Sequence, residues 1–134
     1  MKARERGDTL WMISEEASLC ARVQGLLKGS ICDVRIVRRA ELDNRGFWWG
    51  GDTLPGAILL DLDDDLDWAT GVLHDIKRAH LRTPIIVISK RPDHEFGMKI
   101  VSQGISCFLL RDFDSKELCD IVRSLVKSPS QPLS

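Results

Sequence analysis

Residues 57–63 read AILLDLD, a wholly apolar run over 57–60 that is followed by acidic residues at 61 and 63. Four consecutive apolar residues in so short a segment are typical of a central strand buried on both faces of a parallel sheet. Asp61 follows this run directly, and in open α/β sheets ligands bind just beyond the carboxyl ends of the strands. We therefore expect a central strand over residues 57–60 and a polar site centred on Asp61.

Further short apolar runs lie on both sides of this segment and alternate with helical patterns. Strands are predicted at 10–13, 34–37, 57–60, 85–88 and 107–110. Apolar residues spaced three and four apart predict helices within 19–27, 69–76 and 118–125. Pro92 as a start and Gly104 as a stop predict a shorter helix over 92–101. Alternating strands and helices predict an α/β domain with a parallel sheet and crossover helices.

One glycine-rich segment breaks the alternation where a second crossover helix is due. Residues 43–52 read DNRGFWWGGD, and three glycines in six residues disfavour a regular helix. We expect one or two helical turns at most, around residues 40–44, followed by a loop. Trp48 and Trp49 either cover the core or form a contact surface for a partner, and paired tryptophans in such a loop slightly favour the partner surface.

Composition excludes several classes of function. The chain has 134 residues with 43% hydrophobic and 29% charged residues, which indicates one globular domain. A net charge of -1 provides no overall field for binding nucleic acid or an anionic membrane. The four cysteines form no C-x-x-C pair and the apolar runs are too short for a membrane span, so we expect reduced thiols and a cytoplasmic protein.

Polar residues follow four of the predicted strands. They are SEE at 14–16, DLD at 61–63, SK at 89–90 and RD at 111–112. Parallel strands end at the same edge of a sheet, so these side chains are expected to converge there.

The converging groups suit phosphoryl transfer onto an aspartate. Glu15, Asp61 and Asp63 supply oxygen ligands of the kind that Mg²⁺ prefers. Ser89 is able to hydrogen-bond a phosphoryl group near Asp61, and Arg111 is able to neutralise its charge.

With these residues in place, the chain resembles the receiver domains of two-component response regulators from about residue 9 to residue 126. The resemblance rests on four segments: LWMISEE at 10–16, ILLDLD at 58–63, TPIIVIS at 83–89 and GISCFLLRDF at 104–113. It implies a flavodoxin-like three-layer α/β sandwich with five parallel strands in the order 2-1-3-4-5.

The resemblance also implies roles for single residues. Asp61 would be the phospho-acceptor, Ser89 the hydroxyl that follows the phosphoryl group, and Phe108 the switch aromatic. Glu15 falls on the metal-binding acid of the family, which implies Mg²⁺ held by Glu15, Asp61 and Asp63. The implied partners are a sensor histidine kinase or phosphotransfer protein and a downstream protein or effector domain, with a second copy of the chain as a further candidate.

The site departs from the family pattern at five positions. Ser14 stands where the first of two acids is usual, and Glu15 replaces a shorter aspartate, so weakened Mg²⁺ binding is expected. Arg111 stands in for the family lysine. Asp112 replaces a proline, which predicts a trans peptide after Arg111. Lys90 replaces a small residue and is a candidate substitute cation for Asp61.

Three functions remain open on the sequence. The first is a phosphorylated signalling receiver without enzymatic turnover, and the second is a pseudo-receiver that binds partners without phosphorylation. The third is a fragment of a haloacid-dehalogenase-type phosphatase, because residues 61–63 match its D-x-D signature. It ranks last, since only 73 residues (134 minus 61) follow Asp61. The expected organisation is an N-terminal extension over 1–8, the domain over 9–127, and a tail or linker over 128–134.

Overall fold

A five-stranded parallel sheet forms the centre of the molecule. The computed structural model describes residues 5–42, 47, 53–62, 65–79, 83–90, 98–99, 101–102 and 104–126. The strands are β2 (Leu10–Ile13), β3 (Val34–Val37), β5 (Ala57–Asp61), β6 (Ile85–Ser89) and β7 (Cys107–Leu110). Their spatial order is β3-β2-β5-β6-β7, and every neighbouring pair is parallel. Numbered within this sheet, the order is 2-1-3-4-5, which confirms the predicted topology.

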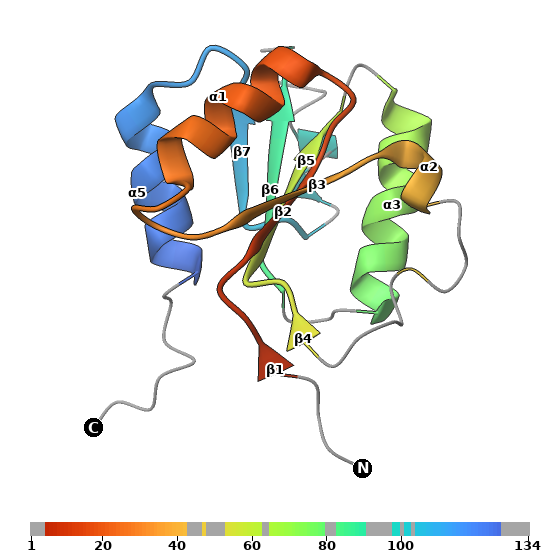
Figure 1. Cartoon of the computed structure of the whole chain (residues 1–134). Coiled ribbons are helices and arrows are strands. Elements are labelled where there is room, and N and C mark those ends of the chain that lie inside the picture. The colour runs from red at the N-terminus through yellow and green to blue at the C-terminus, as the bar shows by residue number, and fades with distance from the viewer. Residues whose placement is uncertain are drawn as a thin grey trace.

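Helices cover both faces of the sheet and make three layers (Figure 1). One face carries α1 (Ala17–Leu27) and α5 (Ser115–Val126), and the other carries α2 (Arg39–Leu42) and α3 (Leu66–Ala79). Residues 98, 99 and 101 are also helical, within the helix predicted over 92–101. No helix in the described residues has the length and apolar character needed to cross a membrane.

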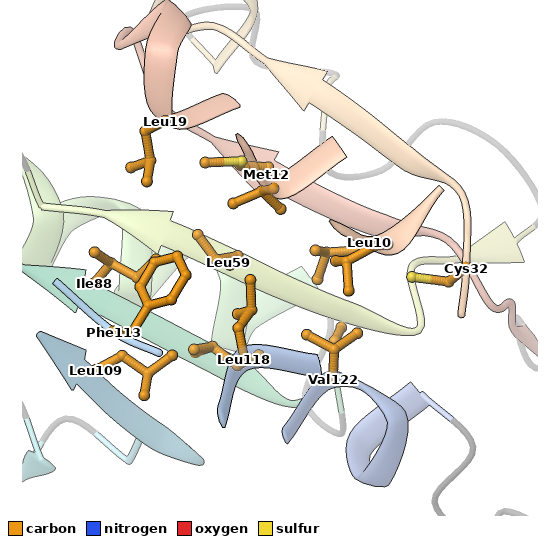
Figure 2. Close-up of a cluster of buried hydrophobic side chains, with 14 of the residues drawn as sticks. Leu10, Met12, Leu19, Cys32, Leu59, Ile88, Leu109, Phe113, Leu118 and Val122 are labelled. Carbon is orange, nitrogen blue, oxygen red and sulfur yellow. The ribbon is translucent and has the colours of Figure 1, made fainter. Parts of the chain in front are cut away.

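Alternate strand residues point to opposite faces and create two cores. The core beneath α1 and α5 contains Leu10, Met12, Ala57, Leu59, Ile86, Ile88 and Leu109 from the strands. The core beneath α3 contains Trp11, Ile13, Ile58, Leu60, Ile85 and Val87. Figure 2 shows Leu118 of α5 beside Leu59 in the first core, with Val122 of the same helix nearer Leu10. Burial on both faces explains why β5 and β6 carry uninterrupted apolar runs.

The second crossover helix is short, as predicted. Its observed extent, α2, has four residues. Phe47, farther along the same connection, packs edge-on against Trp11 with ring centroids 5.5 Å apart. The guanidinium of Arg35 lies 5.1 Å from the Trp11 ring and 5.2 Å from the Phe47 ring. Trp48 and Trp49 lie outside the described residues, so their partner surface stays a prediction.

A second, two-stranded parallel ladder attaches the N-terminal segment to the domain. Its strands are β1 (Glu5–Arg6) and β4 (Thr53–Leu54), and the Gly7 N–H donates to the Leu54 carbonyl at 2.7 Å. A Cβ atom on Gly56 would lie only 2.6 Å from the Gly7 carbonyl oxygen. Glycine at position 56 therefore permits the close approach of the two segments.

Candidate functional site at the carboxyl edge of the sheet

Three predicted site residues, together with Ser14, lie at the carboxyl edge of the sheet. Ser14 follows β2, Asp61 ends β5, Ser89 ends β6 and Arg111 follows β7. The Arg111 N–H donates to the Ser89 carbonyl at 2.9 Å, which fixes the turn after β7 beside the end of β6. Ser14, Asp61 and Ser89 are nearly completely buried, at 4%, 3% and 2% exposure. The parallel topology thus brings Asp61, Ser89 and Arg111 to one edge, as predicted, whereas the carboxylate of Glu15, which was predicted at the same place, pairs with Arg38.

The carboxylate of Asp61 accepts two hydrogen bonds on the same oxygen. The Ser14 hydroxyl donates to Oδ2 at 2.8 Å, and Nη2 of Arg111 donates to it at 2.7 Å. The Ser14 oxygen itself accepts the Glu16 N–H at 3.1 Å, which orients the hydroxyl toward Asp61. Hydrogen bonds to an ionised group are short and strong, so this arrangement stabilises a charged Asp61 in a buried position.

Arg111 links Asp61 to a second carboxylate. Its Nη2 atom also lies 2.5 Å from Oε2 of Glu16, and the Arg111 side chain is only 14% exposed. Its Nε and Nη1 atoms are buried and have no hydrogen-bond partner within the described part of the chain. A guanidinium has five N–H donors, and leaving buried donors unmet costs free energy. Arg111 therefore has donor capacity that Asp61 and Glu16 do not use.

The side chain of Glu15 contacts a different partner from that of its neighbour Glu16. Its carboxylate is exposed and lies 3.7 Å from Nη1 of Arg38, the residue that follows β3. The same Arg38 nitrogen donates to the Glu15 carbonyl at 3.4 Å. The predicted metal-binding acid is thus engaged by a cation on the β3 side of the sheet.

The described side chains in this arrangement do not fit a Mg²⁺ ion at the expected position. Magnesium requires several oxygen ligands in near-ideal octahedral geometry. Glu15 is paired with Arg38, and Asp61 already receives a hydroxyl and a guanidinium. Asp63, the third predicted ligand, lies outside the described residues. Among those described, no group of three acidic, histidine or cysteine side chains is placed to hold a metal ion.

The remaining predicted residues lie around this cluster. Lys90 is exposed, and it lines a cavity of about 520 Å³ together with Leu110, Arg111 and Asp112. Within the described residues, the cation paired with Asp61 is Arg111, and Lys90 forms no ion pair. Phe108 is half-buried and packs against the core beneath α3. The peptide that joins Arg111 to Asp112 is trans, as predicted.

Sequence reasoning missed the part that Glu16 takes in this site. Glu16 occupies the N-cap position of α1, but its side chain makes no capping hydrogen bond. Its carboxylate instead receives Arg111 and the Ser18 hydroxyl. The sequence signal for this contact was Arg111, which stands where the receiver family has a lysine. A planar guanidinium with several N–H donors binds two carboxylates better than an ammonium group does.

Comparison with known proteins identifies the fold. Neither the protein-family models nor the curated proteins give a match to the sequence. Among solved structures, a CheY-like response regulator from Mesorhizobium loti matches with 26% identity and a TM-score of 0.67, covering 88% of this chain and 97% of that one.

Two further structures superimpose more closely at lower identity. The N-terminal signal receiver domain of a response regulator from Bacteroides fragilis has 20% identity and a TM-score of 0.74, covering 91% of this chain and 98% of that one. A CheY-like receiver domain protein from Methanospirillum hungatei has 9% identity and a TM-score of 0.74, covering 97% and 98%. The chain therefore has the fold of the receiver domains of two-component response regulators.

Proposed function

We propose that this receiver-type domain signals by accepting a phosphoryl group on Asp61 from a sensor histidine kinase or a phosphotransfer protein. The observation that carries the proposal is the position of Asp61. It ends the central strand, is buried, and receives a hydroxyl and a guanidinium on one carboxylate oxygen. Such a carboxylate is held ionised and oriented, as a nucleophile must be.

The proposed transfer is a direct displacement at phosphorus. A carboxylate oxygen of Asp61 forms a bond to the phosphorus while the phosphorus–nitrogen bond of the donor phosphohistidine breaks. The electron pair of that bond stays on the imidazole nitrogen, and the product is an acyl phosphate on Asp61. Arg111 offsets the added charge, and its unused Nε and Nη1 donors are available for phosphoryl oxygens.

The proposed signal leaves the site through neighbouring side chains. Ser89 is buried beside Asp61 and would follow the phosphoryl group, while half-buried Phe108 of β7 would change its packing in response. The rearranged surface would then bind a downstream protein, an effector domain or a second copy of the chain. We place this signalling in the cytoplasm.

A second candidate is an interaction module that works without phosphorylation. The observation in its favour is the charge balance of the resting site, where Arg111 already joins Asp61 and Glu16 and Arg38 already engages Glu15. Such a site holds its conformation without a phosphoryl group or a metal ion.

Intact-mass analysis after incubation with acetyl phosphate separates the candidates. The proposal predicts that the full chain gains one phosphoryl group, while Asp61→Asn gains none. An unlabelled wild-type chain, tested both with MgCl₂ and with EDTA, would support the interaction module. Steady release of inorganic phosphate from a phosphomonoester would instead indicate a phosphatase.

A further inference from the structure

We infer that Arg111 is a built-in cation that takes the place of a divalent metal ion in the acidic cluster formed by Asp61 and Glu16. The inference deepens the proposed function, because it states how the same site manages its charge. It rests on the geometry of the cluster and can be tested without phosphorylation.

A single atom makes both contacts. Nη2 of Arg111 lies 2.7 Å from Oδ2 of Asp61 and 2.5 Å from Oε2 of Glu16. A cation between two carboxylates allows both to stay ionised at short distance, which is the role that Mg²⁺ was expected to have. A divalent ion at the same place would meet the positive guanidinium at contact distance, and two cations there repel each other.

The substitutions around the cluster agree with this role. Ser14 donates a neutral hydroxyl to Asp61 at a position where receiver domains usually have an acid. The cluster therefore has one negative charge fewer to neutralise. The second acid of the same loop, Glu15, is balanced separately by Arg38. Both changes lower the attraction of the site for a metal ion, and both fit a site that carries its own cation.

Arginine is suited to this position in a way that lysine is not. The guanidinium keeps its charge at every accessible pH and presents several donors in a fixed plane. It is held in place by the backbone hydrogen bond from Arg111 to Ser89 and by burial of the side chain. A lysine ammonium at this position would be more compact and better hydrated, and would leave Glu16 exposed to another cation.

Calorimetric titration of the full chain with MgCl₂ tests the inference. We expect no saturable binding by the wild type in the millimolar range. Arg111→Lys should bind Mg²⁺ at least about tenfold more tightly than the wild type, because Glu16 is released. The matched control is Arg123→Lys, which makes the same exchange at an exposed residue of α5 and should behave like the wild type. Adding Asp61→Asn to Arg111→Lys should abolish the gain and thereby locate it.

Thermal unfolding gives a second measurement. MgCl₂ should leave the melting temperature of the wild type equal to that in NaCl of the same ionic strength, and should raise that of Arg111→Lys. Saturable Mg²⁺ binding by the wild type would overturn the inference. Failure of a folded Arg111→Lys to gain affinity would overturn it as well. The titration of the wild type with MgCl₂ tests the inference even if Arg111→Lys does not fold.

The two proposals fail in different experiments. Saturable Mg²⁺ binding by the wild type contradicts the built-in cation but leaves Asp61 as acceptor. Absence of phosphorylation under all conditions contradicts the acceptor role, while the titrations still decide the role of Arg111.

Discussion

The Nη2 atom of Arg111 lies 2.7 Å from Oδ2 of Asp61, and this ion pair joins the turn after the last strand to the end of the central strand. The pair is largely removed from solvent, since Asp61 is 3% and Arg111 14% exposed. It therefore acts on both the stability of the fold and the charge of the site.

Arg111→Met should destabilise the protein by about 3 kcal/mol, because it leaves a buried carboxylate without its cation. Urea denaturation measures the change. Adding Asp61→Asn should recover a large part of the loss, because the uncompensated charge is removed. Equal losses in the single and double variants would mean that the cost comes from packing rather than from charge.

Ser14→Ala should lower the free energy of unfolding by about 1–3 kcal/mol, because a buried hydrogen bond to an ionised group is lost. Ser14→Asp should destabilise further in EDTA, since it places a second carboxylate beside Asp61. In the Arg111→Lys background, Ser14→Asp should also raise the affinity for Mg²⁺ in a calorimetric titration, because the guanidinium no longer occupies the cation position. Unchanged or weaker Mg²⁺ binding than in Arg111→Lys alone would count against a cation position at this place.

Gly56→Ala should cost roughly 1–3 kcal/mol, because its Cβ would press on the backbone oxygen of Gly7. Gly25→Ala is the matched control in α1, where no atom lies within 4 Å of the added Cβ. That control should be stabilising by about 0.5–1 kcal/mol through the unfolded state. If chemical denaturation gave the same free energy of unfolding for Gly56→Ala as for the wild type, the β1–β4 ladder would be able to shift at little cost.

Alkaline pH should weaken the fold through its buried thiols. Burial raises the pKa of Cys20, Cys32 and Cys107 above the ordinary value of 9.0. As the pH rises past about 9, the unfolded chain releases these protons first, so the free energy of unfolding falls by at most about 1.4 kcal/mol per pH unit for each thiol. Urea denaturation at pH 8 and pH 10 measures the fall. Cys32→Ala should make it shallower, and an unchanged slope in that variant would contradict the assignment.

The fold and the centre of the site were predictable because they depend on simple patterns. Strands buried on both faces, such as β5 and β6, have continuous apolar runs that the sequence displays directly. Once all strands are parallel, Asp61, Ser89 and Arg111 must come to the same edge. The topology alone therefore positions them, and no side-chain detail is needed.

Other features depend on local geometry that the sequence does not display. Glu15 and Glu16 are adjacent and chemically identical, and only the path of the loop before α1 turns one toward Arg38 and the other toward Arg111. The β1–β4 ladder has two residues in each strand, too few to produce a period. Packing of Phe47 against Trp11 likewise depends on the shape of a glycine-rich connection.

Reductive trapping identifies the residue that accepts the phosphoryl group. The full chain is incubated with acetyl phosphate, treated with borohydride to reduce any acyl phosphate to the alcohol, digested, and analysed by peptide mass spectrometry. We expect Asp61 to be converted to homoserine in the wild type and no other acidic residue to be converted. Conversion at another carboxylate, or at none while the chain is folded, would contradict the assignment of Asp61 as the phospho-acceptor.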